Sequence, residues 1–161
     1  MTVLPILHWP DPRLSQVCAP VDEDVSGLAA DMLDTMYDAP GRGLAAPQVG
    51  VLQRLFVMDT GWRSGAPAPL ICLNPEILWR SDTLAEGAEV CLSIPGPATP
   101  VTRATQIRLG WTGLDGTRHE GMLDGFAAVC AQHEYDHLDG ILTLDHLSPQ
   151  ARAAAIAQAT A

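Results

Sequence analysis

Two histidines and a glutamate in one short segment have the types and spacing of a metal-dependent hydrolytic site. The segment Gly125–Gly140 contains the run HEYDH, with His133 first, Glu134 second and His137 last. In a helix, side chains four residues apart share a face and lie about 6 Å apart along the axis. His133 and His137 are therefore predicted to offer two imidazoles to one metal ion, with Glu134 placed to accept a proton from water bound there. The alternative is a buried helix with two hydrogen-bonded core histidines.

A third ligand is needed, and it is expected upstream. In metalloproteases that extend this motif, a third histidine would fall at Thr143, and threonine is a poor ligand for such a site. No glutamate follows Glu134 in the chain. Cys91, within Glu89–Ser93, is the natural candidate, because a thiolate and two imidazoles leave a fourth position open, as in catalytic sites. The remaining downstream ligands lie too close to the motif to fold back easily: Asp139, Asp145 and His146.

Several segments give the chain a resemblance to a known family. They read GRGLAAPQ at Gly41–Gln48, EVCLS at Glu89–Ser93, and QHEYDH at Gln132–His137. Flanking segments, such as LNPEI at Leu73–Ile77 and HLDGILTLDHLS at His137–Ser148, extend the similarity over nearly the whole chain. In this order the segments resemble the peptide deformylases.

The resemblance implies hydrolysis of the N-formyl group from the initiator methionine of new polypeptides, so the expected substrate is a formyl-methionyl peptide. Glu134 would act as the base, while the Gln48 side chain and the Leu92 backbone N–H would stabilise the oxyanion together with the metal. The family usually uses Fe²⁺, with Zn²⁺, Ni²⁺ or Co²⁺ as substitutes, whereas the ligand types alone suggest zinc. The alternatives are a metal-binding paralogue with weak, lost or redirected activity, a peptidase, and a structural metal module.

A methionine-sized pocket is expected beside the metal. Phe126, Val129 and Cys130 on the helix would line it, together with the glycine loop at Gly43. The same three helix residues also fit an ordinary hydrophobic core.

Four positions depart from the family pattern where the substrate backbone is expected to run. Val90 replaces the glycine of the usual Glu-Gly-Cys-Leu-Ser motif, and Arg42 stands where a small aliphatic residue is usual. Ala98 aligns with a common arginine, and Pro47 occupies a position that is usually threonine or tolerates proline. Valine disfavours positive φ, so extended backbone is expected at Val90. We expect a competent metal site with a narrowed or re-aimed substrate groove and reduced activity.

The glycine loop also matches a dinucleotide-binding fingerprint, but its context is wrong. Gly41, Gly43 and Ala46 have the required spacing. A helix rather than a strand is expected before them, and Pro47 stands where a new helix should continue. A nucleotide site is therefore not expected.

Composition excludes some functions. The net charge of −10, with nine scattered basic residues, argues against a nucleic-acid surface. Four cysteines without paired spacing indicate a reducing cytoplasm. The apolar run Val3–Leu7 is too short for a signal core or membrane span. The tail has one basic residue, Arg152, so the ribosome docking linked to longer basic tails in the family is doubtful.

An α+β fold in one domain, 1–161, is expected, with short mixed or antiparallel strands around one buried helix. Helices are predicted from Ser26, as the cap, to about Asp38, over Gly125–Gly140 with Asp124 as the cap, and from Ser148-Pro149 to the end. Asp136 is expected to pair with Arg103. Strands are predicted at Arg54–Asp59, Leu70–Leu73, Glu76–Arg80, Val101–Ala104, Gln106–Thr112 and Arg118–Leu123, with a break at Asn74-Pro75 and a hairpin turn at Leu114–Thr117.

Overall fold

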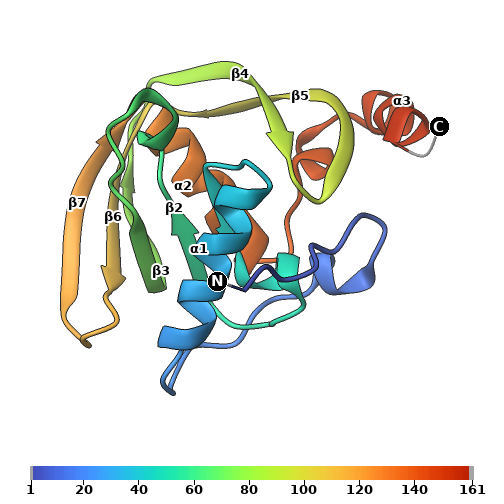
Figure 1. Ribbon diagram of the computed structural model, residues 1–161. Helices are drawn as coiled ribbons and strands as arrows, with labels where there is room; N and C mark the ends of the chain where they lie inside the picture. The colour runs from blue at the N-terminus through green and yellow to red at the C-terminus, as the bar shows by residue number, and fades with distance from the viewer. Residues whose placement is uncertain (1, 160–161) are drawn as a thin grey trace.

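The structure, a computed structural model, describes residues 2–159 and has the predicted α+β architecture (Figure 1). Five strands form an antiparallel sheet in the order β1-β2-β3-β6-β7, and β4 and β5 form a separate two-stranded ribbon. The helices and strands are α1 (Ser26–Asp38), β1 (Gly43–Ala45), β2 (Leu55–Met58), β3 (Leu70–Arg80), β4 (Leu84–Cys91), β5 (Ile94–Ala104), β6 (Gln106–Thr112), β7 (Arg118–Asp124), α2 (Gly125–Leu138) and α3 (Pro149–Ala159). Among the residues described, no helix is long and apolar enough to span a membrane.

Strand β2 is buried on both faces, which places it between two helices. Side chains alternate along a strand, and Phe56 and Met58 pack in the core that includes α2. Leu55 and Val57 pack in the core that includes α1. The run of four buried apolar residues therefore holds α1 and α2 on opposite sides of the same strand.

Helix α2 occupies the interior of the fold, with the sheet on one side and the β4–β5 ribbon across it (Figure 1). Ala128, Ala131 and Leu138 are buried in its core. The predicted left-handed turn after the helix is confirmed at Gly140, which has φ +73°. A Cβ there would lie 2.7 Å from backbone atoms of Ser15, so glycine is required both by the positive φ and by this close approach.

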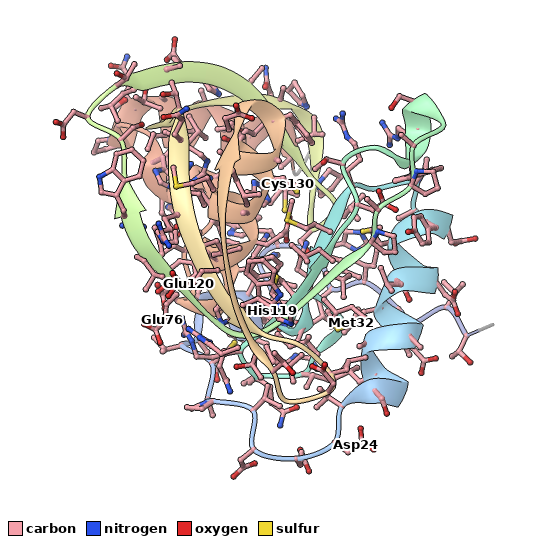
Figure 2. All side chains as sticks on the ribbon, turned by 90° about the vertical axis from the view of Figure 1, so that its left-hand side faces the viewer. Asp24, Met32, Glu76, His119, Glu120 and Cys130 are labelled. Carbon is pink, nitrogen blue, oxygen red and sulfur yellow. The ribbon has the colours of Figure 1, made fainter. Side chains whose placement is uncertain are left out.

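Of the three predicted N-terminal caps, Ser148 at α3 is confirmed, because its Oγ accepts a hydrogen bond from the Ala151 N–H at 3.2 Å. The other two are wrong in detail. The Asp124 side chain makes no capping hydrogen bond to α2. At α1, the Asp24 carboxylate accepts hydrogen bonds from the backbone N and the hydroxyl of Ser26, so Asp24 takes the role expected of Ser26. Figure 2 shows Asp24 in the bend that leads into α1, and Met32 on the side of the helix that faces the strands.

Strand β3 runs through the position where a break was predicted. The break is a bulge, with a register shift between Leu73 and Glu76. Asn74 adopts φ 46°, a conformation that asparagine tolerates better than most residues. Its side-chain amide accepts from the Val21 N–H and donates to the Val21 carbonyl, so the bulge holds the N-terminal segment against the sheet.

The β4–β5 ribbon is longer than the sequence indicates. Strand β5 begins at Ile94 rather than Val101, and β4 was not predicted. Prolines are tolerated because β5 pairs with β4 alone, and Pro100 lies opposite Ala88. The ribbon matters because Cys91 is its last β4 residue. The predicted C-terminal helix is present as α3, and its expected last residues, 160–161, lie outside the described part of the chain.

Candidate metal centre

Cys91, His133 and His137 come together in the structure as the sequence predicts. Their potential ligand atoms all lie within 4.8 Å of one another. The Cys91 Sγ and His137 Nε2 atoms are 3.5 Å apart. A tetrahedral ion with a metal–sulfur bond of about 2.3 Å and a metal–nitrogen bond of about 2.0 Å would separate these atoms by about 3.5 Å. The donor set therefore fits a divalent metal ion.

A network of charges behind His133 fixes its ring. The His133 Nδ1 atom lies 2.9 Å from Glu89 Oε1, which leaves the other ring nitrogen for the metal. Arg103 donates two hydrogen bonds to the Glu89 carboxylate, at 2.7 and 3.0 Å. Burial alone would raise the pKa of Glu89, but hydrogen bonds from His133 and Arg103 outweigh it and hold that pKa below its usual range.

The predicted pair between Arg103 and Asp136 is confirmed, at 2.9 Å.

The role of Glu89 was not predicted, although the sequence contains a signal for it. Glu89 and Cys91 are two residues apart on one strand, so their side chains point to the same face. A carboxylate in that position can reach a histidine that shares the metal with the cysteine.

Glu134 is buried close to the histidines, and its Oε1 atom has no hydrogen-bond partner among the described residues. Burial raises the pKa of Glu134 to about 7. The chain passes so close to it that a Cβ at Gly43 would lie 2.6 Å from Glu134 Oε2 and 2.8 Å from Cys130 Sγ. Glycine at position 43 therefore makes room for this carboxylate.

Gln48 lies in the short 3-10 helix Ala46–Val49 with its amide oriented toward the cysteine loop. Its Oε1 accepts from the Ala45 N–H at 2.9 Å. Its Nε2 donates to Ser93 Oγ at 3.0 Å and lies 3.7 Å from Cys91 Sγ. Leu92, next to Cys91, lines the same space. The amide N–H groups of Gln48 thus lie beside the metal ligands.

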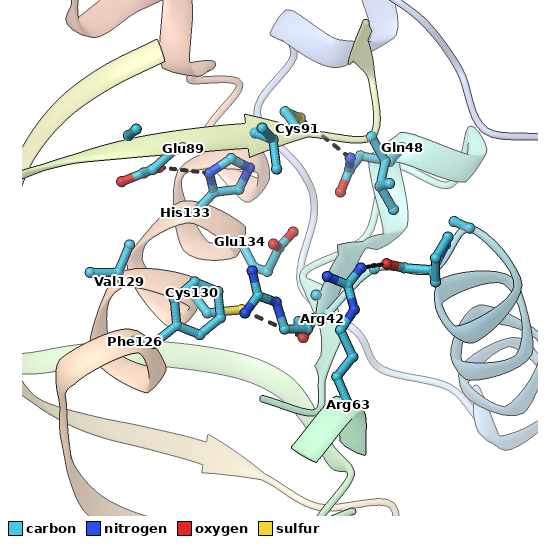
Figure 3. Close-up of a pocket in the computed structure, with 17 residues that line it drawn as sticks. Arg42, Gln48, Arg63, Glu89, Cys91, Phe126, Val129, Cys130, His133 and Glu134 are labelled. Atoms are coloured by element: carbon cyan, nitrogen blue, oxygen red, sulfur yellow. Dashed lines mark hydrogen bonds and ion pairs between the residues drawn. The ribbon is translucent and has the colours of Figure 1, made fainter. Parts of the chain in front are cut away.

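A cavity of about 330 Å³ opens beside these residues (Figure 3). All six residues predicted to bind substrate line it: Arg42, Gly43, Val90, Phe126, Val129 and Cys130. Phe126 is 45% exposed and Cys130 is 6% exposed, so the helix wall runs from an open mouth to a closed interior. The core alternative is therefore wrong for Phe126.

The departures from the family pattern separate into two groups. Val90 lies in β4, so its extended backbone is confirmed, and its side chain does not point into the core because the residue is 70% exposed. Arg42 also lines the cavity. Ala98, by contrast, lines a second cavity of about 230 Å³ between β5 and α3, and Pro47 is buried in the 3-10 helix. Ala98 and Pro47 are therefore not on the wall of the main cavity, contrary to expectation.

Arg63 was not predicted to be near the site. It lies in the turn Trp62–Ser64 and lines the cavity opposite β4. The Trp62 indole N–H donates to the Gly41 carbonyl at 2.9 Å, which joins this turn to the glycine loop. No local pattern in the sequence could indicate this contact between two loops.

A thiolate and two imidazoles around one point, with a buried carboxylate and an open cavity beside them, are the arrangement of a metallohydrolase.

A family profile described as polypeptide deformylase matches residues 3–153. The peptide deformylase of Alkalilimnicola ehrlichii is 54% identical over 92% of this chain and 84% of its own, and that of Agrobacterium fabrum is 44% identical over 92% and 89%. The crystal structure of a peptide deformylase from Legionella pneumophila matches with a TM-score of 0.91 and 40% identity, over 98% of this chain and 94% of that one. The chain belongs to the peptide deformylase family.

Proposed function

We propose that the protein is a metal-dependent hydrolase that removes the N-formyl group from the N-terminal methionine of newly made polypeptides. Family membership supports the reaction, and one observation carries it for this chain. That observation is the buried Glu134 carboxylate with a free oxygen beside the Cys91, His133 and His137 triad. The alternative of a paralogue with lost activity is not favoured, because none of these four residues is replaced.

Cys91 Sγ and one ring nitrogen each of His133 and His137 would hold the metal. When bound, a divalent ion supplies Lewis acidity, which makes water a better nucleophile and polarises the formyl carbonyl. Glu134 takes the proton from the attacking water at Oε1 and delivers it to the leaving amine. Burial of Glu134 favours the neutral form of its carboxyl, which helps it hold the proton before passing it to the amine.

The oxyanion is stabilised by the Gln48 Nε2 amide and the Leu92 backbone N–H. The Ala45 N–H bond to Gln48 Oε1 orients the amide, so its donor end is presented without reorganisation. The apolar interior of the cavity, at Val129 and Cys130, takes the methionine side chain.

We propose Fe²⁺ as the ion in the cell, from the family resemblance, with Zn²⁺, Ni²⁺ or Co²⁺ as functional substitutes.

Four unpaired cysteines support a cytoplasmic location. Helix α3 carries a single basic residue, Arg152, so we do not propose that it docks on the ribosome.

The test is formate release from a formyl-methionyl tripeptide by anaerobically purified protein of measured metal content. We expect about one metal ion per chain and no cleavage of the same peptide without its formyl group. Cleavage of peptide bonds would indicate a peptidase instead. Full metal content without formate release would contradict the proposed function.

A further inference from the structure

Two arginines on the wall of the substrate cavity form no ion pair with any carboxylate in the described part of the chain. All nine basic residues of the chain are arginines, in a chain with 19 acidic residues. Six of them form ion pairs: Arg13, Arg54, Arg103, Arg108, Arg118 and Arg152. Within residues 2–159, no carboxylate oxygen lies within 4.0 Å of the charged nitrogens of Arg42, Arg63 or Arg80. Two of these three, Arg42 and Arg63, line the cavity.

The groups that hold the two guanidinium groups in place are neutral. The positive charges of Arg42 and Arg63 therefore remain without a negative partner there. The Arg42 Cζ atom lies 4.0 Å from the centre of the Phe126 ring, a cation–π contact. Arg63 donates a hydrogen bond to the Pro40 carbonyl and lies beside Trp62. Figure 3 shows both side chains on the side of the cavity that faces Glu89 and Cys91.

The turn that carries Arg63 is anchored from several directions. The Trp62 ring packs edge-on against Tyr37, with 5.3 Å between the ring centres. Tyr37 in turn donates to Asp59, whose other carboxylate oxygen accepts from the Gly61 and Ala68 N–H groups. These contacts fix the position of the loop that carries Arg63.

Neither acidic residue that lines the cavity forms an ion pair with Arg42 or Arg63. Glu89 is bound by Arg103 and His133, and Glu134 lies beside the metal ligands. The two arginines thus form a positive wall of the cavity, with which no carboxylate of residues 2–159 forms an ion pair.

We infer that Arg42 and Arg63 form a carboxylate subsite, which selects formyl-methionyl peptides with Asp or Glu among the two residues after methionine. The inference rests on the proposed function. With methionine in the closed interior, the following residues leave past Phe126 and Arg42 at the mouth. Two extended residues span about 7 Å, so either side chain comes within reach of a long arginine. Guanidinium groups bind carboxylates through charge-assisted hydrogen bonds.

The test compares kcat/KM for formyl-Met-Glu-Ala and formyl-Met-Ala-Glu with their glutamine counterparts, all as C-terminal amides. We expect at least one glutamate peptide to be preferred about tenfold. The preference should fall below twofold in the Arg42→Gln/Arg63→Gln double variant. The matched control is Arg80→Gln, which removes an unpaired arginine outside the cavity and should keep the preference. The glutamine peptides are also measured as free acids. A higher kcat/KM for the free acids than for the amides would show that the arginines bind the terminal carboxylate and not a side chain.

Equal kcat/KM for glutamate and glutamine in the wild type would overturn the inference, as would a preference that persists in the double variant. Acetyl-methionyl versions of the same amides supply a binding readout by calorimetry, with the same expected ratio of Kd values. If no peptide is deformylated, the proposed function fails, and the acetyl pair still decides the inference. Circular dichroism verifies that each variant is folded.

Discussion

Glu134 is a buried carboxylate with an unpartnered oxygen, directly beside a metal ligand in the sequence. Because the residue is not itself a ligand, its charge can be removed while Cys91, His133 and His137 remain. This separation makes the proposed base testable without disturbing the metal.

For Glu134→Gln we expect bound metal to be unchanged and kcat to fall by about 10²–10⁴-fold, since the amide cannot accept the proton. Formate release and elemental analysis measure the two quantities. Cys91→Ala and His137→Ala are the contrasting variants, which should lose the metal. Near-full turnover by Glu134→Gln would show that another group is the base.

At Val90, a β-branched side chain stands 70% exposed at the edge of the cavity, where the family has glycine. Removing it should open the groove, so Val90→Gly is expected to raise kcat/KM on a formyl-methionyl tripeptide. Val17→Gly, at a residue 73% exposed and away from the cavity, is the control for a general glycine effect. Equal values for wild type and Val90→Gly would mean that the valine is neutral.

On the scale of elements, Arg103 joins three parts of the fold. It lies in β5 and binds Glu89 in β4 and Asp136 in α2, and its side chain is 6% exposed. His146 also lies 2.9 Å from the Asp136 carboxylate, so the C-terminal side of the site meets the same network. The arginine thereby fixes the ribbon that carries Cys91 against the helix that carries the histidines.

Arg103→Leu should lower the free energy of unfolding by about 3–5 kcal/mol, because it leaves buried carboxylates without their cation. It should also weaken metal binding, since Glu89 no longer holds His133 in a fixed orientation. The control is Arg108→Gln, whose partner Glu120 is about half exposed, and for which a change below about 1 kcal/mol is expected. Urea unfolding measures both. Similar losses for the two variants would rule out a special role for the buried network.

At the level of the whole molecule, the metal ligands link two distant segments, the end of β4 and the interior helix α2. A ligand that binds only the folded state stabilises it by about 2.7 kcal/mol at a concentration of 100 Kd. The two hydrophobic cores on either side of β2 do not depend on the metal.

Chelation is therefore expected to abolish activity and lower Tm by several degrees while leaving the protein folded at room temperature. Thermal melts with and without Ni²⁺ or a chelator measure the shift. Loss of helical circular dichroism on chelation at room temperature would instead identify a structural metal module.

The sequence by itself determined the features that depend on local periodicity. His133, Glu134 and His137 lie on one helix because the spacing of four matches a helical turn. The apolar run within Arg54–Asp59 was likewise predicted as a strand, and β2 lies there. The Gly140 turn followed from the left-handed conformation that glycine allows. The expectation of a single domain over 1–161 stays a prediction.

Only the tertiary structure decided which side chains from separate segments meet. It placed Glu89 behind His133 and moved Ala98 off the wall of the main cavity, because both positions depend on how the β4–β5 ribbon crosses α2. It also showed which of nine arginines lack a carboxylate, and that Arg63 reaches the cavity through the contact of Trp62 with Gly41. Charge neutralisation acts through space between residues far apart in the chain, so no local sequence pattern encodes it.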